Sequence, residues 1–192
     1  MKSFALPVVL ALAIPGTAAV AAPEKYTLDA SHSQVLFSYN HFGYSTTYNM
    51  FSGFEGEIDF DKDNPANSTV TVSMPVKSLF TGWEARFEHF MNADFFGAED
   101  GDQITFTSTD IEVTGDSTAK ITGDLTINEV TKPVVLDAKL TQSGAHPISG
   151  KDWVGFDATA VVKRSDFNLG AFAPAVSDEL DVVISIEAGK AE

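Results

Sequence analysis

Apolar and polar residues alternate at every second position along most of this chain, which is typical of β-strands with one buried face. In Met50–Phe60, for example, Phe54, Ile58 and Phe60 face one way and acidic residues face the other. Further strands are expected at Tyr26–Asp29, Ser33–His41, Thr69–Pro75, Gln103–Ser108, Ile111–Val113, Ala119–Ile127, Val134–Leu140, Trp153–Val162 and Glu179–Ala188. Their number and even spacing predict an all-β protein, either an antiparallel sandwich or a closed barrel. Closure leaves no exposed strand edge, so we favour an antiparallel β-barrel of about eight strands.

Two segments depart from simple alternation. Trp153–Val162 is apolar on both faces near its end and is expected to be covered on both sides. Ser78–Phe96 changes to a helical period, which places Trp83, Phe87 and Phe90 on one side of a short inserted α-helix.

The helix is expected around residues 82–91, from Gly82 to near Asn92. Thr81 followed three residues later by Glu84 is the pattern of a capping box, which would place the helix start at Gly82. One short aromatic helix in a β chain is expected to be a plug, a lid or a corner brace.

The beginning of the chain has the pattern of a secretory signal peptide. One basic residue, Lys2, precedes the apolar run Phe4–Ile14, and small residues end at Ala21 and Ala22. We therefore divide the chain into a cleaved signal peptide, residues 1–22, and one β-barrel domain, residues 23–192. No later run of apolar residues approaches membrane-spanning length. The mature protein is expected to be soluble outside the cytoplasm.

Charge and cysteine content exclude several classes of function. Loss of Lys2 leaves 11 basic side chains against 27 acidic ones, a formal charge of −16. Such an acidic surface repels nucleic acid and anionic lipid head groups. The chain has no cysteine, which excludes disulfides, iron–sulfur clusters and thiol chemistry.

The polar candidates for chemistry are few. The four histidines form no compact metal-ligand motif, and phosphate-binding loops and nucleophile motifs are missing, so no metal site, catalytic residue or cofactor is predicted. His89 lies off the apolar stripe of the helix, where it faces either a cavity mouth or the ends of strands. Arg164 and Asp166 follow a strand, where they either hold a polar head group at a cavity mouth or brace an irregular loop.

Fifteen phenylalanines are many for this length, and they lie on the inward strand faces and on the helix. They either fill a packed core or line a small apolar cavity, because the interior of an eight-stranded barrel is just wide enough for one of the two. The apolar residues expected to line a ligand tunnel are Phe37, Tyr39, Phe54, Ile58, Trp83, Phe87, Phe90, Ile104, Phe106, Leu125 and Phe156.

Several segments carry a resemblance to a known family. They include His41-Phe42-Gly43-Tyr44-Ser45, Arg86-x-x-His89, Asp94-Phe95-Phe96, Gly123-Asp124-Leu125-Thr126-Ile127 and Val130-Thr131-Lys132-Pro133-Val134. In this order, from Tyr26 to Ala188, the chain resembles the bacterial YceI-like family. The resemblance implies a lipocalin-like antiparallel barrel in the periplasm that encloses a polyisoprenoid or similar chain, often as a dimer, with no established catalytic residues. The chain departs from the family at Asn128-Glu129, where the hairpin is usually Asn-Gly.

The sequence therefore predicts a periplasmic carrier that encloses an isoprenoid of the quinone type, or a similar lipid, with the bound lipid as its only ligand. Expected partners are this lipid, a second copy of the chain and, transiently, a membrane for cargo exchange, but no nucleic acid. Two alternatives stay open. One is an enzyme that acts on a bound lipid or amide with His89 or Arg164 at the mouth, and the other is a ligand-free, stress-related interaction protein with a packed barrel.

Overall fold

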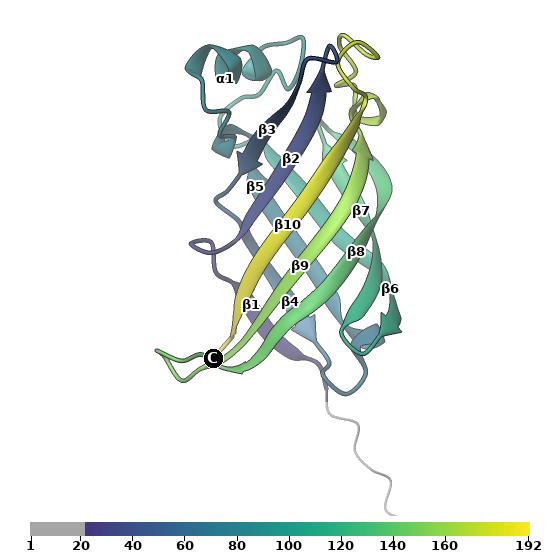
Figure 1. Ribbon diagram of the computed structural model, residues 1–192. Helices are drawn as coiled ribbons and strands as arrows, with labels where there is room; N and C mark the ends of the chain where they lie inside the picture. The colour runs from purple at the N-terminus through teal and green to yellow at the C-terminus, as the bar shows by residue number, and fades with distance from the viewer. Residues whose placement is uncertain (1–21) are drawn as a thin grey trace, which may run out of the picture.

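The computed structural model describes residues 22–192 and confirms an all-β protein built around one closed barrel (Figure 1). The expected signal peptide lies almost wholly outside the described residues and stays a prediction. The strands are β1 (Glu24–Leu28), β2 (Gln34–His41), β3 (Ser45–Phe51), β4 (Glu55–Phe60), β5 (Thr69–Pro75), β6 (Gln103–Gly115), β7 (Thr118–Ile127), β8 (Val130–Ala145), β9 (Asp152–Lys163) and β10 (Glu179–Lys190). One α-helix, α1 (Glu84–Met91), and three short 3-10 helices, Pro65–Asn67, Val76–Ser78 and Arg164–Phe167, complete the elements.

Eight strands form the ring in the order β1-β4-β5-β6-β7-β8-β9-β10, and pairing of β10 with β1 closes it. All the neighbouring strands are antiparallel. Strand β10 is shared between two partners: its end pairs with β1, as in Leu28↔Ala188, and its beginning pairs with β2, as in Val35↔Ile184. The β2–β3 hairpin thus extends the wall of the barrel toward the upper end in Figure 1.

The segment expected to be one strand at Met50–Phe60 is divided into β3 and β4. The break, Ser52–Phe54, contains Gly53 with φ +70°, a left-handed conformation that a strand cannot continue through and that glycine adopts without steric cost. The two strands expected at Gln103–Ser108 and Ile111–Val113 are instead one long strand, β6, with register shifts against β7 on either side of Ile111. Bulges of this kind bend and twist long strands, which helps a barrel to close.

Helix α1 begins two residues later than the capping-box pattern indicates, so that prediction was wrong. Gly82 has φ +75° and Trp83 is extended, and neither conformation belongs to a helix. The Thr81 hydroxyl instead accepts a hydrogen bond from the Trp83 amide at 3.3 Å and donates one to the Trp83 carbonyl oxygen at 2.8 Å. Thr81 therefore stabilises a turn ahead of the helix, and the helix has no side-chain cap.

Strand β9 is covered on one face only, contrary to the expectation from its composition. Val154 and Val162 are buried on the inner face, whereas Val161 on the outer face is 60% exposed. Valine is common in β-strands because its branched side chain suits the extended backbone, so a valine on the outer face does not require that this face be covered. Of the helices described within residues 22–192, none is both long and apolar enough to cross a membrane.

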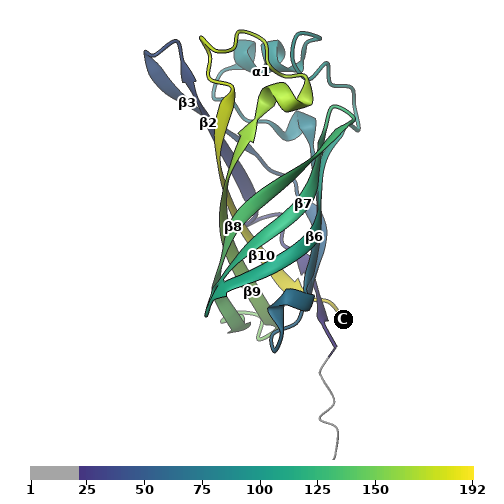
Figure 2. The same ribbon diagram turned by 90° about the vertical axis from the view of Figure 1, so that its right-hand side faces the viewer.

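Figure 2 shows that α1, the β2–β3 turn and the β9–β10 connection gather at the same end of the barrel, here called the upper end. The apolar core follows this division. One cluster around Tyr26, Phe60 and Val154 packs between the strands of the lower half. A second, around Phe51 and Leu79, joins the barrel wall to the insertion that carries α1.

Candidate ligand-binding site

A cavity of about 890 Å3 lies inside the barrel. Its walls come from the inward positions of the strands, together with Pro65 and Gly115 near the lower end and Phe42 and Phe172 near the upper end. The cavity therefore runs along most of the barrel. Its size lies within the range of small-molecule sites, and its lining is dominated by aliphatic and aromatic side chains.

Most of the residues expected from the sequence to line a tunnel do line this cavity. They are Phe37, Tyr39, Phe54, Ile58, Trp83, Phe90, Ile104, Phe106, Leu125 and Phe156. Strand parity explains the agreement, because successive side chains point to opposite faces of a strand and the acidic residues identify the outer face. Whether these residues contact a ligand stays a prediction.

Phe87 is different, because it is not among the residues that line the cavity. It packs against the cluster formed by Val76, Leu79 and neighbouring residues, where the insertion meets the barrel. The late start of α1 separates Trp83 from the helical stripe to which it was assigned. Trp83 is 64% exposed and lines the cavity, whereas Phe87 fixes the helix to the barrel.

The wall formed by β8, β9 and β10 supplies further lining residues that were not predicted from the sequence. They are Leu136, Ala138, Leu140, Ala158, Ala160, Val162, Leu180, Val182, Ile184 and Ile186. The alternation that located the other strands was present here too, in Val134–Leu140 and Glu179–Ala188. The same alternation therefore predicts that these alanine and branched aliphatic side chains point inward, although the predicted lining consisted mostly of aromatic residues.

Of the three polar residues expected at the mouth, two line the cavity and one does not. His89 and Arg164 are lining residues, whereas Asp166 is exposed and lies outside the lining. His89 packs edge-on against Phe95, with ring centroids 5.0 Å apart, and against Phe172 at 6.4 Å. His89 is therefore part of the aromatic cluster at the upper end.

Arg164 is buried and braces the β9–β10 connection. Its guanidinium donates hydrogen bonds to the carbonyl oxygens of Leu169 (2.5 Å), Ala171 (2.7 Å), Val176 (2.8 Å) and Ser177 (2.8 Å). Burial lowers the pKa of Arg164 from its ordinary value, and the charge of nearby Asp178 acts in the opposite direction. With these bonds made, Arg164 serves as the loop brace that the sequence offered as an alternative to a head-group site.

Asn49 is a buried polar residue without a protein partner. Its side chain is 3% exposed, and neither its amide nitrogen nor its oxygen has a hydrogen-bond partner in the described part of the chain. It is on β3 between Thr47 and Phe51, which share its face of the strand and line the cavity. A buried amide without partners is costly, and Asn49 itself is not among the residues that line the cavity, so its unpaired groups are enclosed by the protein beside the cavity wall.

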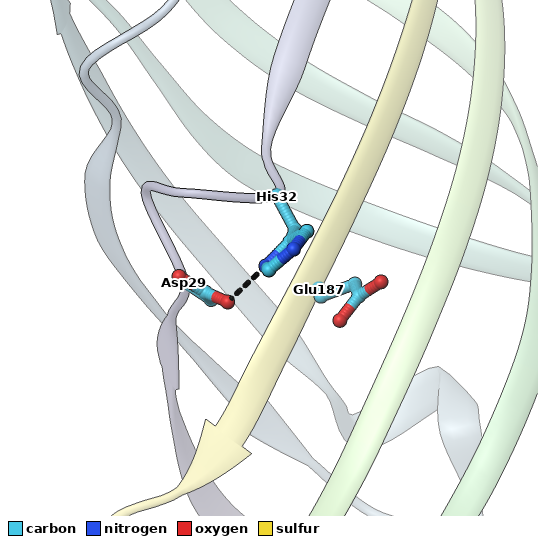
Figure 3. Close-up of side chains that lie close together, drawn as sticks. All are labelled: Asp29, His32 and Glu187. Carbon is cyan, nitrogen blue, oxygen red and sulfur yellow. Dashed lines mark hydrogen bonds and ion pairs between the residues drawn. The ribbon is translucent and has the colours of Figure 1, made fainter.

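A group of three side chains with metal-ligating atoms lies elsewhere, on the outer surface. Asp29, His32 and Glu187 have ligand atoms within 4.8 Å of one another (Figure 3). His32 Nδ1 lies 2.8 Å from an oxygen of Asp29, and the Trp153 indole donates to Glu187 at 3.0 Å. Hydrogen bonds to Ser31 and His32 lower the pKa of Asp29, and the bond to Asp29 raises the pKa of His32.

The Asp29 amide donates to the Glu187 carbonyl oxygen at 2.8 Å and the Glu187 amide donates to the Ser33 hydroxyl at 3.3 Å, so these residues join the β1–β2 connection to β10. The sequence showed Asp29 and His32 only three residues apart. Glu187 joins them through strand pairing, which brings the end of β10 beside the β1–β2 connection. No metal was predicted, and that expectation stays a prediction.

Comparison with known proteins identifies relatives over nearly the whole described domain. A family model described as "YceI-like domain" matches residues 26–188. The chain is 42% identical over 169 residues to "Protein YceI" of Escherichia coli O17:K52:H18, which covers 88% of this chain and 87% of the relative.

Solved structures share the fold. Burkholderia cenocepacia BcnA matches with a TM-score of 0.74 and 25% identity, over 83% of this chain and 98% of that one. A domain from Saccharophagus degradans, described as a polyisoprenoid binding domain implicated in plant cell wall breakdown, matches with a TM-score of 0.68. Its identity is 15%, over 86% of this chain and 98% of that one, so this likeness concerns the fold alone.

Proposed function

This chain belongs to the YceI-like family, and we propose that it is a periplasmic carrier that encloses the long apolar chain of an isoprenoid lipid, of the quinone type or similar, inside its barrel. The observation that carries the proposal is the apolar cavity of about 890 Å3 that runs along the barrel. At about 30 Å3 for each water-sized group, it has room for on the order of 30 methylene-sized groups. That corresponds to a chain of several five-carbon units.

Burial of the chain supplies the driving force. Each CH2 group removed from water contributes about 0.8 kcal/mol, so about ten buried groups contribute about 8 kcal/mol before the costs of association. Few polar contacts are needed, which fits a lining dominated by apolar side chains. The polyisoprenoid-binding description of the Saccharophagus domain, which shares this fold, supports the same ligand class.

The proposed location in the periplasm rests on the signal-peptide pattern of residues 1–22. We propose a binding role without catalysis, because the Arg164 donors are taken up by backbone carbonyls and His89 packs among aromatic rings.

The test is native mass spectrometry of protein purified from its own periplasm, followed by solvent extraction of whatever is released. We expect one isoprenoid-like molecule per chain, and the same spectra report whether the protein forms the expected homodimer. A bound molecule without a long apolar chain would contradict the proposal. Protein that stays empty after incubation with isoprenoid quinones would also contradict it and would favour the ligand-free alternative.

A further inference from the structure

Four large aromatic side chains are exposed at the upper end of the barrel. Phe42 is 50% exposed, Tyr44 91%, Trp83 64% and Phe172 58%. We call these four residues the mouth aromatics. Phe42, Trp83 and Phe172 also line the cavity, so they are in contact with both the interior and the solvent. Figures 1 and 2 show the three segments that carry them, the β2–β3 turn, the residues before α1 and the β9–β10 connection, at one end of the molecule.

The stretches around Phe42, Tyr44 and Phe172 contain no charged side chain, although Asp166 and Asp178 flank the second of them in the β9–β10 connection. Residues 33–54 contain no Asp, Glu, Lys or Arg, and neither do residues 167–177, in a chain with 27 acidic side chains. The opposite end is different, because its loops contain Asp61, Lys62 and Lys151. An acidic protein is repelled by an anionic lipid surface, and the two uncharged stretches reduce that repulsion beside the cavity opening. The charges at this end include those of Glu84 and Glu88, which are exposed on α1.

The backbone at two of these residues gives independent evidence that the side chains have a use. Phe42 has φ 55° and Phe172 has φ 63°, in the left-handed region that is uncommon for bulky residues. Glycine or asparagine adopts such turns at lower cost. The chain thus keeps an exposed phenylalanine where a smaller residue would fold more easily, and strained backbone of this kind is concentrated at functional sites.

We propose that this upper face docks transiently on a phospholipid bilayer, with the mouth aromatics at the level of the head groups. This inference rests on the proposed function, because it describes where the isoprenoid enters and leaves. Aromatic side chains with polar atoms, such as those of Tyr44 and Trp83, favour the membrane interface. With the mouth held against the bilayer, the apolar chain passes between lipid and cavity without crossing water.

The two tryptophans allow a direct test, since they lie at opposite ends of the protein. Trp83 is at the mouth, and Trp153 is the second residue of β9, which begins at the lower end. The Trp153→Phe variant reports on Trp83, and Trp83→Phe reports on Trp153. Both are mixed with vesicles of phosphatidylcholine that contain brominated acyl chains and no isoprenoid. We expect quenching and a blue shift for Trp83 and no change for Trp153. No quenching of either tryptophan, or quenching of Trp153 alone, would overturn the proposal.

A second experiment identifies the side chains that dock. The triple variant Phe42→Asn, Tyr44→Ser, Phe172→Asn removes aromatic surface and leaves residues that tolerate positive φ. The matched control is Ile148→Ser, because Ile148 is 92% exposed on the β8–β9 loop at the opposite end. In vesicle flotation we expect at least roughly tenfold weaker binding for the triple variant, which is about 1.4 kcal/mol, and no change for the control.

Docking relies on aromatic surface and not on charge, whereas the acidic protein as a whole is repelled by anionic lipid. We therefore also expect weaker binding to vesicles of equal parts phosphatidylcholine and phosphatidylglycerol than to phosphatidylcholine alone. Salt screens this repulsion, so the difference between the two kinds of vesicle should shrink at high salt. Binding that is equal in the triple variant and the control would overturn the proposal. So would binding that requires the anionic lipid or a membrane protein, and the latter would assign the face to a protein partner.

The outcome is separable from that of the proposed function. If the wild-type protein carries isoprenoid and the Tyr44→Ser variant, whose side chain lies outside the cavity lining, exchanges cargo with vesicles more slowly, both proposals hold. If the wild-type protein carries no isoprenoid, the carrier function fails whatever the vesicle result.

Discussion

Phe106→Ala tests whether the cavity wall contacts a ligand or serves only as a core. Phe106 is on β6, opposite Val72 of β5 and Leu125 of β7. Its ring lies over Gly123, because a Cβ atom built on that glycine would come within 2.3 Å of the ring. Phe106 also lines the cavity and is only partly buried, so part of its ring faces the open interior.

The geometry gives the expected magnitudes. A phenylalanine side chain buries about 150–250 Å2, so one ring face offers a ligand about 100 Å2. At about 25 cal/mol per Å2 its loss weakens binding by about 2–3 kcal/mol, or roughly 30- to 150-fold. Truncation in a close-packed core costs about 3–5 kcal/mol of folding free energy, but here one side of the ring already faces a void, so we expect about 1–2 kcal/mol.

The matched control is Val154→Ala. Val154 is fully buried and does not line the cavity. Loss of its two methyl groups should cost about 2 kcal/mol of folding free energy and leave ligand affinity unchanged. Affinity is measured by titrating delipidated protein with a fluorescent polyprenyl analogue, and stability by urea unfolding of the same ligand-free samples. If Phe106→Ala binds the analogue as tightly as the wild type while losing as much stability as the control, Phe106 is core and the reasoning is refuted.

Four further predictions concern single residues. Arg164→Met should lower the free energy of unfolding in urea by about 3 kcal/mol or more, because it leaves buried carbonyl groups without donors. Glu129→Gly should raise the melting temperature by about 2–4 °C, since Glu129 has φ 61° and relief of a left-handed residue outweighs the added flexibility of glycine. Asn49→Leu should raise the stability of ligand-free protein by about 1 kcal/mol, and a loss of stability would mean that the amide has a partner such as an ordered water. His32→Gln should lower the melting temperature most between about pH 4 and 6.5. Because the pKa of His32 is raised in the folded protein, its contact with Asp29 stabilises the fold fully below pH 6.5, and this contribution is lost as pH rises through the raised pKa. Because the pKa of Asp29 is lowered, its contribution is present above pH 3.8 and is lost as pH falls through the lowered pKa.

The barrel and most of its lining could be predicted from the sequence because one local rule decides both. In β4, acidic Glu55, Glu57 and Asp59 mark the outer face, so Ile58 and Phe60 must point inward. In β2 and β6 the alternation of apolar and uncharged polar residues placed Phe37 and Phe106 correctly in the cavity wall.

The errors occur where a residue's conformation depends on distant parts of the chain. Thr81 and Glu84 form a valid local capping pattern, but positive φ at Gly82 delays the helix. Arg164 could have held a head group, and only the folded β9–β10 connection shows that its donors are taken up by backbone carbonyls. Likewise, the proximity of Glu187 to Asp29 depends on the register between β1 and β10, which no local pattern reveals.

The hollow interior itself has an identifiable cause in the sequence. An eight-stranded barrel is narrow enough for its own side chains to fill, so a cavity requires small residues at some inward positions. Ala138 of β8 lies opposite Ala158 of β9, and Ala160 follows on the same inward face. The other wall has large rings at Phe54 and Phe60.

An empty apolar cavity of about 890 Å3 deprives its walls of the contacts that a close-packed core would make. A bound chain restores those contacts, so under the proposed function the loaded protein is more stable than the empty one by an amount that grows with ligand concentration. Release into water would expose the apolar cargo and leave the cavity without packing at the same step. Exchange against a bilayer avoids the first cost, because the chain moves between two apolar surroundings. Under the proposed function, this thermodynamic asymmetry accounts for a mouth that carries exposed aromatic residues and no charged side chain within residues 33–54 and 167–177.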